Sequence, residues 1–204
     1  MRGMIVTSRH VAAGRSVVLA ALLAAAGCGE TTETPVVRYE ANDRVYGEVA
    51  VGDKHVVRSL SAAGPVTLEG ENLDVVRWYV FRYTTAPTQS EANAALAQVV
   101  PTYAALADTM VFDVSVQASQ GQITYNGALT LGVPGNLACD VENARAPVAA
   151  SSLFNDLTVR GSDSVTVLRH TGSVDVALSP GHITIEAAIP ATGACTATTD
   201  QGNI

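Results

Sequence analysis

Short apolar-polar-apolar triplets in the last third of the chain constrain the fold more than any other feature. Their first residues are spaced by 8, 9, 9 and 12 positions, and turn-forming residues such as glycine stand between them. A unit this short cannot bury its apolar side alone, so each unit must stack on its neighbours. The triplets begin at Leu157, Val165, Val174, Ile183 and Cys195.

This spacing predicts an all-β fold, a β-solenoid-like stack of short strands in which the first and third residues of each triplet face inward. A β-sandwich is the alternative, because its strands also recur about every 8–12 residues. One short helix is expected at 89–99. Thr88 stands three residues before Glu91, the spacing of a capping box, and Pro101 would end the helix.

Upstream of the helix, β-branched and aromatic residues predict two strands, at 66–68 and 75–83, joined as a hairpin by the turn at 69–72. The second strand carries bulky side chains on both faces, which predicts that both faces are covered. We therefore interpret its aromatic residues as core rather than as a stacking platform for sugars or peptides. These residues are Trp78, Tyr79, Phe81 and Tyr83. Two further strands are expected after the helix, at 111–116 and 123–133.

The N-terminal residues have the sequence pattern of a signal peptide. Arg2, Arg9 and Arg15 form a positively charged region that precedes an apolar run at 17–26. The run is shorter than the roughly 20 residues that cross a bilayer as a helix. It ends in small residues before Cys28, which resembles the bacterial lipobox and implies that Cys28 is lipidated. An ordinary signal peptide, cut near Ala26, is the alternative.

We expect three parts: a lipoprotein signal peptide at 1–27, a lipid-anchored flexible tether at 28–44 and a β-strand-repeat domain at 45–204. The membrane is then a partner through the lipid anchor. Gly29 follows the cysteine where an aspartate would retain a lipoprotein at the inner membrane, which resembles sorting to the outer membrane. The expected location is therefore the cell envelope, with the lipid anchor in the outer membrane.

The charge of the chain argues against nucleic acid as a partner. Twelve basic and nineteen acidic residues give a formal charge of −7, and the pI is about 4.9. Without residues 1–27 the balance would be nine against nineteen, or −10. Such a chain lacks the basic surface that neutralises phosphates.

The chain contains two more cysteines, Cys139 and Cys195. In an exported protein, a disulfide between two such cysteines is the default expectation, because the compartment is oxidising. A two-sided stack would place them about three rungs apart, or roughly 14 Å at about 4.8 Å per rung. A disulfide needs Cα atoms within about 7 Å. The sequence leaves open both the disulfide and two free thiols.

No motif in the sequence indicates catalysis, a cofactor or a metal. Gly-x-Ser-x-Gly, phosphate-binding loops and Cys-x-x-Cys are all missing. His170 and His182 would lie at different heights of the stack and His55 far upstream, so we interpret them as solvated turn residues rather than zinc ligands. The acidic stretch with Glu69 and Glu71 is interpreted as an exposed turn and not a calcium loop.

The order of the motifs resembles that of the bacterial cell-envelope proteins called putative adhesins. The matching segments are Gly-Pro-Val-Thr-Leu-Glu-Gly at 64–70, Leu-Thr-Leu-Gly-Val-Pro at 129–134, Gly-Ser-Val-Asp-Val at 172–176 and Thr-Asp-Gln-Gly-Asn-Ile at 199–204. The resemblance extends over about 45–204. It implies an exported β-repeat body and brings no catalytic residues.

Together these features predict a non-enzymatic, lipid-anchored envelope protein that mediates surface contact or envelope scaffolding, with a protein or a surface polymer as partner. The alternative is a periplasmic small-ligand carrier or enzyme that uses a pocket near the helix and the aromatic strand. A deep pocket lined by Trp78 and converging polar groups would favour that alternative.

Overall fold

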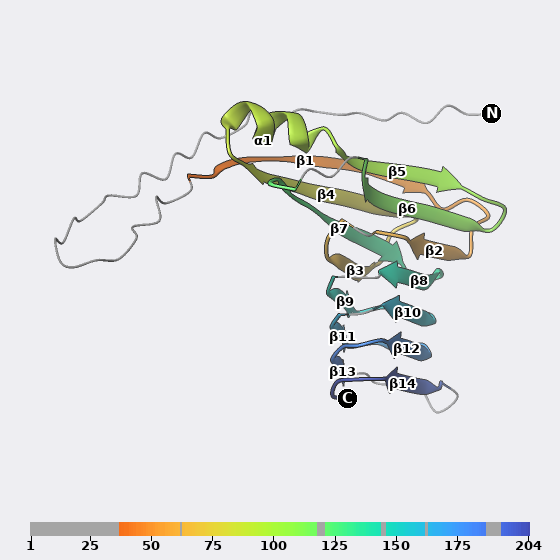
Figure 1. Cartoon of the computed structure of the whole chain (residues 1–204). Coiled ribbons are helices and arrows are strands. Elements are labelled where there is room, and N and C mark those ends of the chain that lie inside the picture. Colours follow the sequence, from red (N-terminus) through yellow and green to blue (C-terminus); the bar gives the residue numbers. More distant parts are fainter. Residues whose placement is uncertain (1–36, 62, 118–120, 144–145, 162, 187–192) are drawn as a thin grey trace.

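The computed structural model of the protein describes residues 37–204, apart from 62, 118–120, 144–145, 162 and 187–192. These residues form two seven-stranded sheets and one short helix, α1 (Gln89–Leu96), so the prediction of an all-β fold with one helix is confirmed. Figure 1 shows long strands in a broad upper part and short strands in a narrow column below it.

The two sheets face each other, and the chain passes between them repeatedly. Sheet A has the order β1 (Tyr39–Ala50), β4 (Val75–Ala86), β7 (Thr124–Pro134), β3 (Val66–Glu71), β9 (Val148–Ser151), β11 (Val165–Leu168), β13 (Ile183–Glu186). Sheet B has the order β5 (Val99–Ala105), β6 (Thr109–Val116), β2 (Val56–Ser59), β8 (Ala138–Asn143), β10 (Leu157–Gly161), β12 (Val174–Leu178), β14 (Cys195–Thr199).

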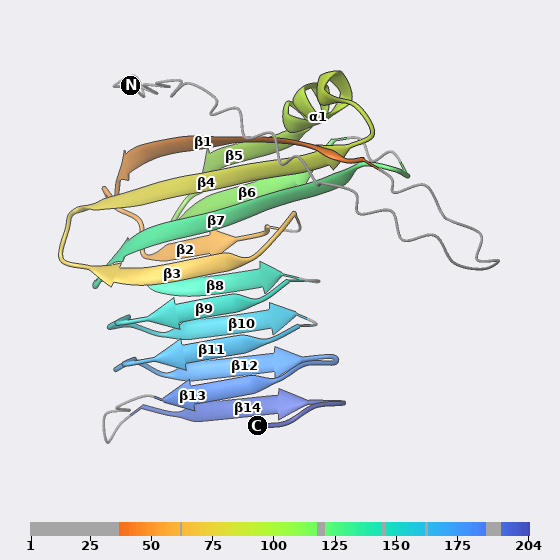
Figure 2. The same ribbon diagram turned by 90° about the vertical axis from the view of Figure 1, so that its left-hand side faces the viewer.

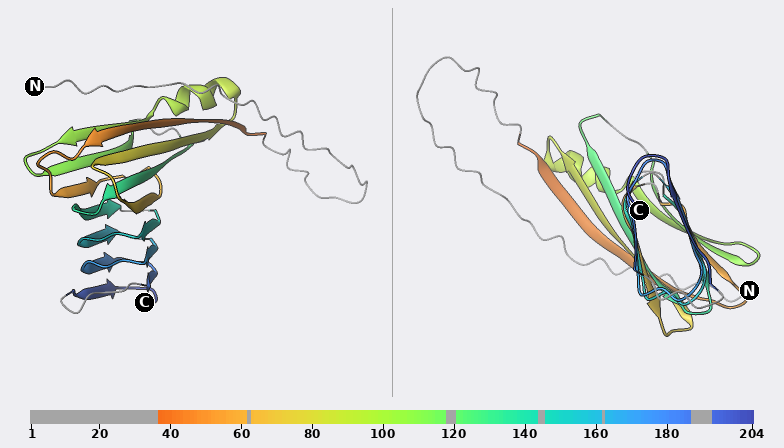
Figure 3. Two further views of the ribbon diagram at one scale, coloured as in Figure 1. Left: turned by 180° about the vertical axis from the view of Figure 1, so that it is seen from behind. Right: turned by 90° about the horizontal axis from the view of Figure 1, so that it is seen from below.

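The column is a two-sided coil. From β8 onward, successive strands alternate between the sheets, and each pairs in parallel with the strand two places along the chain. Seen from below, the coil is a flattened loop (Figure 3). Its corners repeat as well, because Ser152 after β9 and Arg169 after β11 both have positive φ, 56° and 53°.

The upper part is antiparallel within each sheet. In sheet A, β4 pairs with β1 on one side and with β7 on the other, and in sheet B β5 pairs with β6 (Figure 2). A continuous cluster of buried residues runs between the sheets, from Val76 and Phe112 in the upper part to Val176 and Ile183 in the column. The two parts therefore share one hydrophobic core.

The triplets that begin at Leu157, Val165, Val174 and Ile183 contribute to this core as predicted, whereas Cys195 of the last triplet is exposed. Leu157 and Val159 are buried, whereas Thr158 between them is half-buried on the outer side. The same pattern holds for the triplets that begin at Val165 and Val174. Alternation in a strand sends successive side chains to opposite faces, which is why every second residue reaches the core.

The predicted hairpin of the segments at 66–68 and 75–83 is wrong. β3 and β4 lie in the same sheet, but β7 runs between them, parallel to β3 and antiparallel to β4. The connection at 72–74 crosses over one strand, which is within its reach at about 3.3–3.6 Å per residue. The predicted turn at 69–72 is also misplaced, because β3 continues to Glu71, and the pairing partner comes from a segment far along the chain.

The helix begins as predicted and ends earlier. The backbone N–H of Glu91 donates to the Thr88 side chain at 3.2 Å, which caps the first turn. The helix stops at Leu96, since Val99 already belongs to β5 and pairs with Val116. Pro101 therefore lies inside a strand. Within the described residues, no helix has the length and apolar character to cross a membrane.

The folded body also begins earlier than residue 45. β1 starts at Tyr39, and the whole of it pairs with β4. Residues 39–44 therefore belong to the sheet and not to a tether. The predicted signal peptide, the lipidated Cys28 and the first part of the tether lie outside the described residues.

Candidate functional site

An aromatic surface lies on the outer side of sheet A, in the upper part of the molecule. Along β4, Tyr79, Phe81 and Tyr83 alternate with Val80, which is in the core, and Arg82, which contacts sheet B, so the aromatic side chains point away from sheet B. All three are half-buried. They are not part of the core, and the prediction that both faces of this strand are covered is wrong.

The neighbouring strands complete this surface. Tyr46 of β1 lies directly opposite Tyr79 and is 44% exposed. The guanidinium of Arg44 lies 6.0 Å from the centre of the Phe81 ring, a cation–π distance. We call the surface formed by Tyr46, Tyr79, Phe81 and Tyr83 the aromatic face.

Tyr83 anchors one end of the aromatic face. Its hydroxyl donates to the Glu40 carboxylate at 2.8 Å. Desolvation, this hydrogen bond and the negative charge of Glu40 all raise the pKa of Tyr83. The phenol therefore stays protonated and keeps its role as a donor.

A hollow of about 260 Å³ lies at the other end of the aromatic face. The hollow exists because Gly132 has no side chain. A Cβ on Gly132 would stand 2.5 Å from the Glu71 carboxyl carbon. Across this glycine, Arg77 of β4 donates to Glu71 of β3 with Nε at 2.8 Å and also with Nη2. The hollow is lined by Tyr46, Gly47, Glu48, Glu69, Glu71, Arg77, Trp78, Tyr79, Thr130 and Gly132.

Two carboxylates of the hollow are exposed and unpaired. Among the described residues, the side chains of Glu48 and Glu69 make no hydrogen bond or ion pair. Their charges, after the larger effect of Glu71, raise the pKa of Arg77. The hollow therefore presents free carboxylate acceptors beside an exposed guanidinium and two phenols.

A row of small polar residues continues from the aromatic face down sheet A. The register places Tyr79 beside Thr130, and Thr130 beside Thr67. In the column the same row continues through Ala149 to Thr166 and Thr184. The register thus makes these residues neighbours along the outer side of the sheet, from the upper part into the column.

A second space, an apolar cleft of about 220 Å³, lies between the sheets in the upper part. Thr102 and Asp113 are its polar lining residues, apart from the Tyr103 phenol. Desolvation raises the pKa of Asp113. The cleft is lined by Val45, Trp78, Val80, Pro101, Thr102, Tyr103, Phe112, Asp113, Val114 and Leu129.

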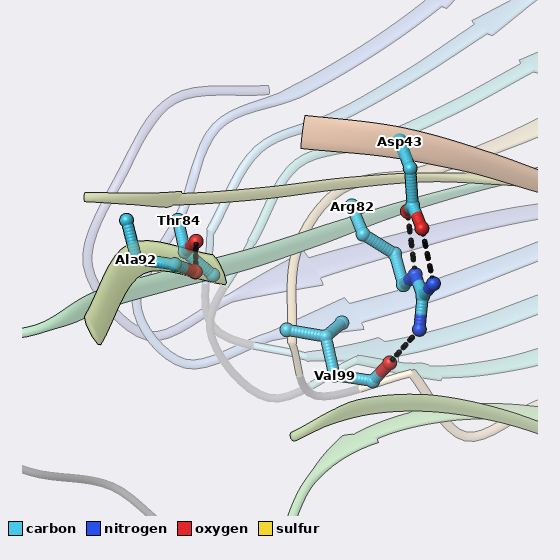
Figure 4. Close-up of polar contacts among 5 residues, drawn as sticks. All are labelled: Asp43, Arg82, Thr84, Ala92 and Val99. Atoms are coloured by element: carbon cyan, nitrogen blue, oxygen red, sulfur yellow. Dashed lines mark hydrogen bonds and ion pairs between the residues drawn. The ribbon is translucent and has the colours of Figure 1, made fainter. Parts of the chain in front are cut away.

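An ion pair lies next to this cleft, toward the helix. Arg82 donates to both carboxylate oxygens of Asp43 on β1, with Nε at 2.7 Å from Oδ1. Its Nη1 also donates to the carbonyl of Val99 on β5 at 3.1 Å, which joins sheet A to sheet B (Figure 4). Further along β4, the Thr84 hydroxyl donates to the Ala92 carbonyl at 2.8 Å and holds α1 in place.

Cys139 and Cys195 are separate thiols. The register runs from Cys139 to Leu157, then to Val174 and finally to Cys195, which gives the three rungs that a two-sided stack requires. At about 4.8 Å per rung this is roughly 14 Å, twice the reach of a disulfide. Of the two outcomes that the sequence leaves open, the structure has the free thiols.

In a Cys28→Ala variant, which keeps Cys139 and Cys195 as the two thiols of the chain, we expect titration without reductant to find both reactive after denaturation and only one in the native protein. Cys195 is exposed at the last described strand, whereas Cys139 is buried and desolvation raises its pKa to about 12. A buried, protonated thiol reacts slowly. A Cys195→Ala variant with no fast native thiol would confirm the assignment, and a Cys139–Cys195 peptide in mass spectrometry would contradict it.

The histidines divide into two kinds. His182 is exposed, and its Nδ1 accepts from the backbone N–H of Asn203 at 3.4 Å. His170 is 1% exposed, so its interpretation as a solvated turn residue is wrong. Its Nε2 lies 3.1 Å from the Ser173 carbonyl, while its Nδ1 is buried without a partner. Desolvation lowers the pKa of His170, which favours the neutral ring.

No described group of three or more His, Cys, Asp or Glu side chains is placed to hold a metal ion. The acidic stretch predicted as a turn is instead the end of β3, where Glu71 pairs with Arg77 and Glu69 is exposed. The sequence analysis did not single out Tyr46 or Glu48. Their signal is the alternation along β1, which places both on the same side as Arg44.

No protein-family model and no curated protein matches the sequence. Among solved structures, a putative cell adhesion protein from Clostridium sporogenes is similar with 8% identity and a TM-score of 0.48, over 80% of this chain and 97% of that one. A putative adhesin from Parabacteroides distasonis has 12% identity and a TM-score of 0.34, over 78% and 79%. A putative adhesin from Bacteroides fragilis has 10% identity and a TM-score of 0.24, over 79% and 97%.

Proposed function

We propose that the protein is a non-enzymatic, lipid-anchored component of the bacterial cell envelope, of the adhesin type, that mediates surface contact or envelope scaffolding. The observation that supports this proposal best is the outer side of sheet A, where partly exposed aromatic and polar side chains lie next to one another on paired strands. Such surfaces are typical of contact sites rather than of enclosed reaction sites.

The position of the N-terminal strand agrees with this role. β1 is the edge strand of sheet A in the upper part, and the column extends away from it (Figure 1). A lipid on Cys28 would therefore connect to the upper part. The aromatic face lies on β1 and β4, so it would be presented near the anchored end, with the column reaching outward.

The alternative, a small-ligand carrier or an enzyme, has one observation in its favour. The apolar cleft is lined by Trp78, as that alternative requires. A catalytic or strongly selective pocket also needs several converging polar groups. The cleft contributes Thr102 and Asp113 among mostly apolar residues, so the contact function is better supported.

The anchor is tested by labelling cells that express the protein with radioactive palmitate. We expect label in the unaltered protein and none in Cys28→Ala, because the lipid that carries the fatty acids is attached through the cysteine sulfur. Cys195→Ala is the matched control, since it removes an exposed thiol and keeps Cys28. Label that persists in Cys28→Ala would contradict the anchor. Recovery of the labelled protein with inner-membrane markers in a density gradient would contradict the outer-membrane location.

A further inference from the structure

We propose that the aromatic face and its hollow bind a polysaccharide of uncharged hexose or N-acetylhexosamine units. This inference rests on the proposed contact function and names the partner. It concerns the outer side of β1, β4 and β7, and uses the rings of Tyr46 and Tyr79, the carboxylates of Glu48 and Glu69 and the guanidinium of Arg77.

The first argument is the exposure of the tyrosines. Tyr46 and Tyr79 lie side by side on paired strands and line the hollow. A tyrosine ring offers an apolar surface together with a polar hydroxyl, which suits a partner with both kinds of surface. A pyranose ring has this character, because its C–H groups form apolar faces and its hydroxyls lie around the edge.

The second argument is the set of hydrogen-bonding groups. Sugar hydroxyls both donate and accept, so a binding site for them needs acceptors and donors close together. Glu48 and Glu69 provide free carboxylate acceptors, and Thr130 provides a hydroxyl. Arg77 uses Nε and Nη2 for Glu71, and its Nη1 has no hydrogen bond among the described residues. Hydrogen bonds to charged groups such as these are stronger than those between neutral groups.

The rigidity of the hollow is the third argument. Arg77 is fixed by its two hydrogen bonds to Glu71, and these pass over Gly132. The three strands that carry these residues are held by the ladders of β4 with β7 and of β3 with β7. A site whose side chains are held before binding loses less entropy when the ligand arrives.

Charge selects among polysaccharides. Glu40, Glu48 and Glu69 stand on this side of the sheet with the Glu71–Arg77 pair, and Arg44 is the other basic residue of the aromatic face. The surface is therefore negative. Acidic glycans and anionic lipid headgroups would be repelled, whereas uncharged hydroxyl-rich chains would not.

The shape of the surface favours a polymer over a single sugar. The hollow of about 260 Å³ is shallow and continues into the open aromatic face along β4. Small-molecule sites are concave and enclose most of their ligand. Here Tyr79, Phe81 and Tyr83 follow one another at about 6.8 Å, the rise of two residues in a strand, so several units of a chain could lie along them.

The experiment is a binding isotherm of the purified full-length protein on microcrystalline cellulose and on chitin, with alginate gel and phosphatidylglycerol vesicles as acidic comparisons. We expect saturable binding to cellulose or chitin, and the two arms distinguish a hexose from an N-acetylhexosamine chain. Tyr46→Ala and Tyr79→Ala should each weaken binding about tenfold, since an aromatic contact of roughly 1.4 kcal/mol corresponds to that factor.

Tyr39→Ala is the matched control. Tyr39 lies on the same strand as Tyr46 and is 42% exposed, but alternation places it on the opposite side of the sheet. It should bind like the unaltered protein, and circular dichroism should show all three variants folded. The proposal is overturned by equal binding in Tyr46→Ala and Tyr39→Ala, by absence of binding to both neutral polymers, or by preference for alginate or vesicles. Since the isotherm uses purified protein, these results do not depend on whether Cys28 is lipidated.

Discussion

Gly70→Ala should destabilise the protein by about 3 kcal/mol, the upper end of the range for overpacking a well-packed site. Gly70 lies near the end of β3, where β9 stops and the chain turns at Ser152. A Cβ on Gly70 would stand 1.8 Å from the Ser152 carbonyl oxygen and 2.5 Å from its carbon. The obstacle is backbone, so a side-chain rotation cannot relieve it. Urea denaturation measures the loss.

Gly121→Ala is the control for Gly70→Ala. A Cβ on Gly121 would have no heavy atom within 4 Å. We therefore expect a change of under about 0.5 kcal/mol, as for ordinary surface substitutions. Equal denaturation midpoints for the two variants would show that β3 and the Ser152 turn do not pack as closely as the structure indicates.

Arg82→Met should lower the free energy of unfolding by about 3 kcal/mol, the lower end of the range for removing one partner of a buried ion pair. The side chains of Arg82 and Asp43 are only 16% and 24% exposed. Methionine would leave the Asp43 carboxylate without its partner and the Val99 carbonyl without this donor. The adjacent edges of the two sheets should loosen together. Denaturation curves and hydrogen exchange in β5 measure the effect.

An exposed ion pair gives the matched control. The side chains of Arg160 and Asp175 are 44% and 47% exposed. Arg160→Met should therefore lower the free energy of unfolding by under about 1 kcal/mol. The double variant Asp43→Asn with Arg82→Met should recover part of the stability, because it removes the uncompensated charge. If the double variant is no more stable than Arg82→Met, the loss comes from packing of the arginine and not from the stranded carboxylate.

The sequence predicted what depends on local alternation. In each triplet, side chains two apart are apolar, and a period of two is enough to identify a strand and its inner side. The cap at Thr88 is also local, because Thr88 and Glu91 contact within one turn. The separation of Cys139 and Cys195 followed from counting triplets, which the register bears out.

The sequence failed where a distant segment decides the structure. β7 lies between β3 and β4, and nothing in residues 66–83 encodes that insertion. Alternation along β4 separates Val80 from Tyr79 and Phe81, but it does not show which of the two sides meets another layer. His170 follows a strand and precedes Gly172, a typical turn context, although the fold buries it.

The repeated corners of the column make its height adjustable. Ser152 and Arg169 occupy equivalent corners one turn apart, because β9 pairs in parallel with β11, and β11 pairs in parallel with β13. Duplication or deletion of such a turn would change the reach of the protein by about 4.8 Å per turn and leave the core above and below intact. The column can therefore change in length by whole turns while the upper part, with the aromatic face, stays the same.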